Sequence, residues 1–493
     1  MEQGTPPNRP TFGQAASDQG QPAQPAQPAP AAAPAPASQS AAAPEAPAAA
    51  PAAGSIAPAA PTKIEDTGLD MAFLINLMTK GMYLESMVEV GQLTNATKLS
   101  SNVVNTVTQE MVDRKLIAAS GSAGAGAAAA VRYQLTKEGQ QVALDACNQN
   151  QYFGPAPVPL ADYQAQIKKQ NIAGERVSKD DIARSFADII VPEEFIKRLG
   201  PAINSGHSIL IYGPAGNGKT TVAEKVAAIF ETTVYVPHCF EIDGSIIKVF
   251  DPSVHKAVEQ AEAGEAGRPS LRRERNDRRW VACQRPVVIT GGELTMDMLD
   301  LKFNELAKFY EAPLHVKALN GTFIIDDFGR QKVSPEEILN RWIVPLQTRV
   351  DYLTLHSGKA FQLPFDELVI FSTNMAPDDL MDPAFLRRIP YKLETYDPTE
   401  EAFKAIFTAV AGKQGIELTE DIFNYVVKEL TETVKKPLAC YQPKFIIDQV
   451  VAACKYEGTQ PALTQGYVDD AISNLYATGS QYVGQVGMGD AEP

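Results

Sequence analysis

Apolar and polar residues follow two different periods along the chain, and the change of period divides it into regions. From residue 69 to 150 the apolar residues first recur at helical spacing and then alternate. This pattern predicts three helices, two strands and a fourth helix, over 69–82, 87–93, 101–114, 116–120, 131–136 and 137–148. From about residue 186 short apolar runs alternate with helical patterns, which is typical of a parallel sheet.

The N-terminal region has a different composition from the rest of the chain. It holds 14 of the 36 prolines before residue 62, and residues 21–61 are almost entirely Ala, Pro, Gln and Ser. Such a segment lacks the apolar surface needed to offset the entropy of ordering, about 1–2 kcal/mol per residue. We therefore expect residues 1–66 to form a disordered Pro/Ala-rich tail.

Charge and cysteine usage exclude several classes of protein. The net charge of −15 argues against bulk coating of nucleic acid or of an anionic membrane. No run of about 18 apolar residues exists, and the first residues lack the pattern of a secretory signal. Five scattered cysteines without a CxxC pair indicate reduced thiols rather than disulfides or zinc. We expect a cytoplasmic protein without membrane insertion.

The elements predicted between residues 67 and 150 resemble a winged-helix domain. In that resemblance the helix over 101–114 would be the DNA-reading helix, exposing polar residues but no Lys or Arg before Arg114. The unit from 69 to 150 has six basic and seven acidic side chains, and its hairpin tip is Gly and Ala. Docking to protein is therefore the favoured role, and DNA binding stays the alternative.

A phosphate-binding motif follows the apolar run 209–212. Residues 213–220 fit GxxxxGK[ST] at every position, and a helical pattern follows from Thr221. Glycines let backbone N–H groups surround phosphates, while Lys219 reaches the β/γ oxygens and Thr220 ligates Mg²⁺. The expected ATP-binding residues are Gly213, Pro214, Ala215, Gly216, Asn217, Gly218, Lys219, Thr220 and Thr221.

Two acids end a later apolar run, over 321–325. We expect Asp326 to serve Mg²⁺ together with Thr220, and Asp327 to orient or deprotonate the attacking water. Further strands are expected over 232–236 and 287–290.

These motifs resemble the AAA+ family of ATPases over about residues 186–480. The resemblance makes Asn374, after the run 368–373, the polar residue near the γ-phosphate. It makes Arg387 or Arg388 an arginine finger for the neighbouring subunit, and it leaves the choice between them open. It implies a helical lid over 399–475, in which Lys444 stands at the position of a basic residue that binds nucleotide.

Two residues depart from the family pattern. The family usually has Glu where this chain has Asp327, which is one methylene shorter, so a loop must bring it closer or hydrolysis is slow. Lys444 replaces the usual Arg and lacks its bidentate fork, and a solvated helix-start lysine is the alternative interpretation. An insertion with Arg268, Arg272, Arg273, Arg275, Arg278 and Arg279 would either grip a substrate or form a solvated or intersubunit face.

The expected fold class is therefore α/β, with an AAA+ parallel-sheet core, a C-terminal helical lid and an N-terminal winged-helix domain. The expected regions are the tail (1–66), the winged-helix domain (67–150), a linker (151–185), the nucleotide-binding domain (186–397), the lid (398–480) and a C-terminal tail (481–493).

The expected function is ATP hydrolysis, with ATP and Mg²⁺ as cofactors, coupled in a homo-oligomeric ring to remodelling or assembly of a protein client. Six subunits are the expected ring size. One alternative is a DNA-associated regulator or loader, and a second is a nucleotide-dependent switch with slow hydrolysis. No motif identifies the client.

Overall fold

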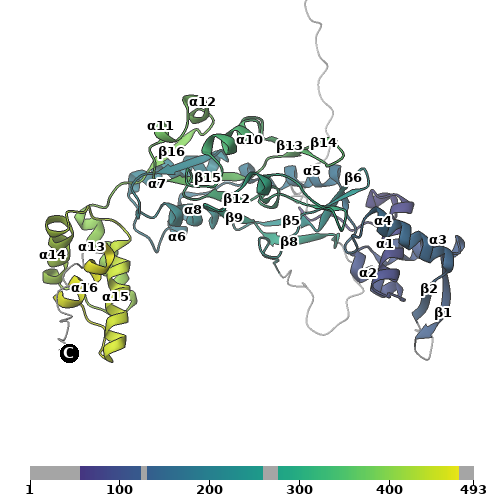
Figure 1. The fold of residues 1–493 in the computed structure, drawn as a ribbon, viewed down its shortest axis with the longest axis horizontal. Coiled ribbons are helices and arrows are strands. Elements are labelled where there is room, and N and C mark those ends of the chain that lie inside the picture. Colours follow the sequence, from purple (N-terminus) through teal and green to yellow (C-terminus); the bar gives the residue numbers. More distant parts are fainter. Residues whose placement is uncertain (1–55, 124–129, 259–275, 477–493) are drawn as a thin grey trace, which may run out of the picture. The chain divides into compact units, whose positions relative to one another are not determined.

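The computed structural model describes residues 56–123, 130–258 and 276–476, and Figure 1 labels most of their helices and many of their strands. A set of N-terminal helices with one strand pair comes first along the described chain, two five-stranded sheets and two strand pairs follow, and further helices end it. Within the described ranges no helix combines the length and the apolar character needed to cross a lipid bilayer.

The N-terminal elements occur in the predicted order. Ser100 and Thr136 begin two of the helices, because each side chain accepts a hydrogen bond from a backbone N–H three residues later. The two strands pair antiparallel, and Leu74, Val104 and Met111 are fully buried in the shared core. The elements are α1 (Met71–Leu84), α2 (Val90–Thr97), α3 (Ser101–Asp113), β1 (Ile117–Ala123), β2 (Ala130–Leu135) and α4 (Lys137–Gln149).

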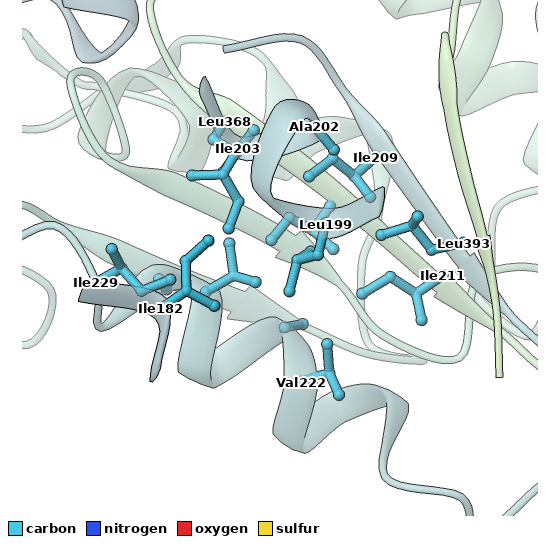
Figure 2. Close-up of a cluster of buried hydrophobic side chains, with 14 of the residues drawn as sticks. Ile182, Leu199, Ala202, Ile203, Ile209, Ile211, Val222, Ile229, Leu368 and Leu393 are labelled. Carbon is cyan, nitrogen blue, oxygen red and sulfur yellow. The ribbon is translucent and has the colours of Figure 1, made fainter. Parts of the chain in front are cut away.

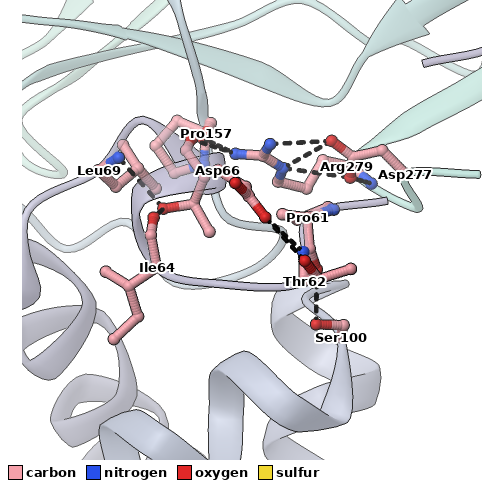
Figure 3. Close-up of polar contacts among 10 residues, drawn as sticks. Pro61, Thr62, Ile64, Asp66, Leu69, Ser100, Pro157, Asp277 and Arg279 are labelled. Atoms are coloured by element: carbon pink, nitrogen blue, oxygen red, sulfur yellow. Dashed lines mark hydrogen bonds and ion pairs between the residues drawn. The ribbon is translucent and has the colours of Figure 1, made fainter. Parts of the chain in front are cut away.

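The last eleven residues of the expected tail, 56–66, are described and have defined partners (Figure 3). The Ser100 hydroxyl donates to the Pro61 carbonyl at 2.7 Å, and the Asp277 backbone N–H donates to the Pro58 carbonyl at 2.9 Å. A short 3-10 turn, η1 (Glu65–Thr67), follows. Composition misses this segment because many of its contacts are made by backbone carbonyls, with a few side chains such as Asp66 and Ile64 adding to them.

The stretch 151–185, expected to be a linker, also has regular structure. Tyr163 and Ile167 are buried in one apolar cluster with Phe240 and Trp280. These partners come much later in the chain, so periodicity within the stretch does not reveal them. Its elements are β3 (Val158–Pro159), α5 (Leu160–Lys169), the 3-10 turn η2 (Ile172–Gly174) and α6 (Lys179–Ser185).

A parallel sheet of five strands forms the centre of the α/β region. Its order is β16-β4-β15-β12-β9, and every neighbouring pair is parallel. The expected strand at 287–290 joins this sheet, whereas the expected strand near 232–236 does not. The five strands are β4 (Ile209–Tyr212), β9 (Val287–Thr290), β12 (Thr322–Ile325), β15 (Leu368–Thr373) and β16 (Tyr391–Glu394).

Both faces of this sheet are covered, which explains why its central strands read as continuous apolar runs. On one face, Leu199, Ile203 and Val222 pack against Ile209 and Ile211 (Figure 2). On the other, Trp342 makes edge contacts with Phe323 and Phe371, at centroid distances of 5.2 and 6.3 Å. The covering helices are α7 (Glu193–Ser205) and α8 (Lys219–Ala227) on the first face and α10 (Pro335–Thr348) on the second.

The remaining strands lie outside the parallel sheet. A second five-stranded sheet has the order β10-β11-β7-β6-β3, while β5 pairs antiparallel with β8, and β13 with β14. These strands are β5 (Thr233–Pro237), β6 (Cys239–Ile242), β7 (Ser245–Lys248), β8 (Trp280–Gln284), β10 (Lys302–Asn304), β11 (Phe309–Glu311), β13 (Val350–Thr354) and β14 (Ala360–Pro364).

Helices end the described chain. Phe403, Phe407 and Phe423 are buried in a core of their own with residues of the later helices. The helices are α13 (Glu400–Lys413), α14 (Glu420–Lys428), a π-helical turn η4 (Glu429–Thr433), α15 (Gln442–Glu457) and α16 (Gln465–Tyr476). Four short helices precede them, η3 (Met296–Leu299), α9 (Leu314–Lys317), α11 (Pro377–Leu380) and α12 (Pro383–Leu386).

Candidate nucleotide site

The loop between β4 and α8 has the geometry of a phosphate cradle. Gly213, Gly216 and Gly218 all have positive φ, at 137°, 83° and 77°. Gly218 precedes the first residue of α8, so the free N–H groups of that helix begin at the motif. A side chain at Gly213 would also come within 2.2 Å of the Thr395 carbonyl oxygen. Pro214 and Ala215 are exposed on the loop, and Thr221 is exposed in the first turn of α8.

The Lys219 side chain is held inside this loop. Its ammonium donates to the carbonyl oxygens of Gly213 at 3.0 Å and Pro214 at 2.8 Å. Burial lowers the pKa of Lys219, and the nearby Asp327 and Asp326 carboxylates oppose that effect. The loop therefore carries a buried cation close to two acids.

The two acids lie at the carboxyl end of β12, next to the phosphate loop. The Thr220 hydroxyl donates to the Asp326 carboxylate at 2.7 Å. The Asn374 side-chain amide, just after the neighbouring strand β15, donates to the Asp327 carboxylate at 3.3 Å. Parallel strands bring such side chains to one edge of a sheet. Four residues expected from sequence are thus brought together here.

The phosphate loop is also tied to residues after β16 and before α15. The Asn217 amide donates to the Asp397 carboxylate at 2.8 Å and accepts from the Cys440 backbone N–H at 3.1 Å. The Tyr441 backbone N–H donates to the Gly216 carbonyl at 3.1 Å. A side chain at Gly216 would come within 2.3 Å of the Tyr441 ring. We call these contacts the Asn217 clasp.

A cavity of about 690 Å³ adjoins the clasp. Asn217 and Cys440 line it together with Phe195, Val222 and Tyr396, so its wall is mostly apolar with a few polar groups. This size and lining suit a small organic ligand.

Metal binding here would need few protein ligands. Within the described residues no three or more His, Cys, Asp and Glu side chains gather as a metal site. The Thr220 hydroxyl and the Asp326 carboxylate are both oxygen donors, which suits Mg²⁺, an ion that commonly takes its other ligands from water and phosphate.

Three of the expected residues lie outside this group of contacts. Lys444 is 72% exposed and pairs with Asp448 one turn along α15. Arg388 donates to the Ala384 carbonyl at 2.6 Å and lies 6.0 Å from the centre of the Phe385 ring. Arg387, by contrast, is exposed.

The sequence patterns did not reveal Asp397, Cys440 and Tyr441, which contact the phosphate loop. Asp397 follows β16, the neighbour of β4, so the rule that ligands lie at the carboxyl ends of parallel strands could have found it. Nothing in the spacing of Cys440 and Tyr441 links them to a loop more than 200 residues earlier.

The arginine-rich insertion is described only in part. Arg268, Arg272, Arg273 and Arg275 lie outside the described residues. Arg278 donates to the Asn95 side chain at 3.3 Å. Arg279 is buried and pairs with Asp277 at 2.8 Å, so it is a core residue and does not face a substrate.

Comparisons with solved structures give low similarity over much of the chain. A point mutant of RuvB from Thermotoga maritima has 13% identity and a TM-score of 0.32, covering 62% of this chain and 73% of that one. The Thermotoga maritima RuvB Holliday junction branch migration motor has 16% identity and a TM-score of 0.31, covering 58% and 70%. NtrX from Brucella abortus has 13% identity and a TM-score of 0.36, covering 68% and 66%.

Two family models match parts of the chain. Residues 399–474 match a domain of unknown function (DUF8689), and no curated relative matches the chain. Residues 209–271 match the ATPase family associated with various cellular activities (AAA), a stretch that begins at β4 and includes the whole phosphate loop. The chain thus contains a segment similar to the AAA ATPase family, within an α/β fold that has a parallel five-stranded sheet and C-terminal helices.

Proposed function

We propose that the chain binds ATP with Mg²⁺ and hydrolyses it beside the phosphate loop. One observation carries this proposal. The Thr220 hydroxyl lies 2.7 Å from Asp326, while Asp327, the next residue, contacts Asn374 of the adjacent strand. The motif, the acid pair and the polar side chain come from three separate segments, and their meeting at one edge of the sheet supports a phosphate site there.

Binding would use residues already oriented toward a phosphate chain. The loop N–H groups from Gly213 to Thr221 and the start of α8 favour anions. Lys219 would exchange its two carbonyl partners for β/γ oxygens. Thr220 and Asp326 would hold Mg²⁺, which neutralises charge on the phosphate oxygens when bound. Pro214 and Ala215 complete the loop.

Hydrolysis would depend on Asp327. Its carboxylate is exposed at the edge of the sheet and accepts a hydrogen bond from Asn374, so it can orient or deprotonate a water. The adjoining cavity of about 690 Å³ would take the nucleoside. Lys444 would need to leave Asp448 to reach a phosphate, so we favour the Asn217 clasp as the link between the phosphate loop and the lid.

A neighbouring subunit would supply the arginine finger in a homo-oligomeric ring, with six subunits as the expected number. Arg387 is the better candidate because it is exposed, whereas Arg388 is engaged with Ala384 and Phe385. Subunit motion would remodel or assemble a protein client. The five cysteines are free, in keeping with the expected cytoplasmic setting.

The DNA-associated alternative gains no support from the expected reading helix. Helix α3 exposes Asn102 and Asn105, but Gln109 is bonded to Asp113 and Arg114 is paired with Glu110. We therefore propose that residues 67–150, which resemble a winged helix, dock to protein.

Phosphate release from ATP, with and without double-stranded DNA, tests the choice of function. Hydrolysis that DNA does not change supports the protein-remodelling role. Turnover that DNA stimulates at low salt only would favour the DNA-associated role. Tight ATP binding without turnover, at protein concentrations where the oligomer forms, would favour the slow switch.

A further inference from the structure

The backbone at Asp327 is unusual for a residue with a side chain. Its φ of 47° lies in the left-handed region, which non-glycine residues adopt seldom. Such conformations persist only where the surroundings fix them, and they gather at functional sites. This residue is also the proposed base, so the cause of its conformation bears directly on the reaction.

One side chain braces the turn that contains Asp327, whose carbonyl also accepts from the Arg330 backbone N–H at 2.9 Å. The Gln331 amide nitrogen donates to the carbonyl oxygens of Asp326 at 2.9 Å and Asp327 at 3.2 Å. The Gln331 amide oxygen accepts from the Gly329 backbone N–H at 2.8 Å. Gln331 thus bridges three backbone groups of the turn with one planar amide.

The rest of the turn is fixed to the sheet by Phe328. Its backbone N–H donates to the Ser372 carbonyl at 2.7 Å, and its carbonyl accepts from the Thr373 hydroxyl at 2.7 Å. Its ring is buried against Phe371, at a centroid distance of 5.0 Å. Asp327 is therefore held between a fixed Phe328 on one side and the strand end at Asp326 on the other. Among the described residues, only the Gln331 side chain contacts the carbonyl oxygens of both Asp326 and Asp327.

We infer that Gln331 is a positioning residue for hydrolysis, which holds Asp327 in its left-handed conformation and so places this short carboxylate beside Asn374. The inference rests on the proposed ATPase function. It also explains how an Asp can act where the AAA+ family usually has Glu. The conformation of the turn would compensate for the side chain being one methylene shorter. Gln331 touches the backbone of the acids rather than the phosphate loop, so its loss should slow turnover and spare binding.

Steady-state phosphate release by the full-length chain tests this inference, with binding of a fluorescent ATP analogue measured in parallel. Gln331→Met keeps the volume and removes every hydrogen bond, and Gln331→Glu keeps the acceptor for Gly329 but loses the donor. Both should lower kcat at least tenfold, while KM and the analogue's Kd stay within about twofold. Lys332→Ala, an exposed neighbour, should match wild type in all three quantities.

The outcomes separate the inference from the function on which it rests. If either Gln331 variant keeps wild-type kcat, or if kcat and binding fall together, Gln331 does not position Asp327. If the wild-type chain turns over no faster than Asp327→Asn, the proposed function itself fails, and with it the reaction that Gln331 would serve. Thermal unfolding of each variant shows whether a loss of kcat reflects a loss of fold.

Discussion

Buried charged residues in this protein differ in the partners that the fold provides. Lys219 donates hydrogen bonds to two carbonyl oxygens. Arg279 pairs with the Asp277 carboxylate and donates to the carbonyl oxygens of Thr67 and Pro157. Glu367, just before β15, is fully buried, and neither of its carboxyl oxygens has a hydrogen-bond partner in the described part of the chain. Burial raises the pKa of Glu367 well above its usual value, against the opposing charge of Arg349.

The raised pKa of Glu367 predicts that stability falls as pH rises. The unfolded chain loses this proton near pH 4.5, while the folded chain keeps it. Above that pH the free energy of unfolding therefore decreases as pH rises. The loss is about 1.4 kcal/mol per pH unit until the folded group titrates. Glu367→Gln removes this penalty, so we expect its advantage in Tm over wild type to be larger at pH 8 than at pH 5.

The matched control for this prediction is Glu417→Gln, which changes an exposed glutamate. Its Tm difference from wild type should be small and the same at both pH values. A constant difference for Glu367→Gln between pH 5 and pH 8 would show that Glu367 is ionised in the folded protein.

At the scale of elements, Arg279 joins three segments that are distant in sequence. It lies just before β8 and bonds to Asp277. It also donates to the carbonyl oxygen of Thr67, the last residue of η1, at 2.9 Å, and to that of Pro157, just before β3, at 3.1 Å (Figure 3). Arg279→Met leaves Asp277 buried without its partner, and we expect a loss of about 3–5 kcal/mol in the free energy of unfolding, measured in urea.

The double variant Asp277→Leu with Arg279→Met serves as the comparison. Replacing both charges removes the unpaired carboxylate, so it should unfold at a higher urea concentration than Arg279→Met alone. A single variant within 1 kcal/mol of wild type would mean that the ion pair does not hold these segments together.

Sequence could predict the elements whose signals are local. The helix starts at Ser100 and Thr136, the covered strands of the parallel sheet and the phosphate loop all follow from residues close to one another in the chain. The second sheet could not be predicted in this way, since β3 pairs with β6 about 80 residues later. The ordered segment 56–66 could not either, because hydrogen bonds of its backbone carbonyls leave no pattern in composition.

In the candidate site, too, residues with local sequence signals were predicted and the others were not. Thr220 was predictable from the phosphate-binding motif, and Asp326, Asp327 and Asn374 were predictable because they follow apolar runs. Their mutual distances depend on the strand order, in which β4, β15 and β12 are neighbours. Gln331 and Cys440 were not predicted, because their contacts involve backbone groups and carry no motif. Asp397, whose carboxylate bonds to the Asn217 side chain, was not predicted either, although it follows β16.

For the whole molecule, the proposed function requires that each copy of the chain supplies an arginine to the nucleotide site of its neighbour. We expect Arg387→Ala to lower turnover by about 10³-fold or more in the assembled oligomer, while ATP binding to the isolated chain is unchanged. Arg388→Ala should affect Tm more than turnover, because Arg388 bonds within its own subunit. Wild-type turnover in both variants would exclude a finger in this segment.

The most direct test of the central claim is phosphate release from Mg-ATP by the purified full-length chain, compared with Asp327→Asn and Lys219→Ala. If the chain hydrolyses ATP as proposed, wild type turns over repeatedly, Asp327→Asn loses turnover but retains ATP binding, and Lys219→Ala loses both. Wild-type release no faster than that of Asp327→Asn, at concentrations where the oligomer forms, would contradict it.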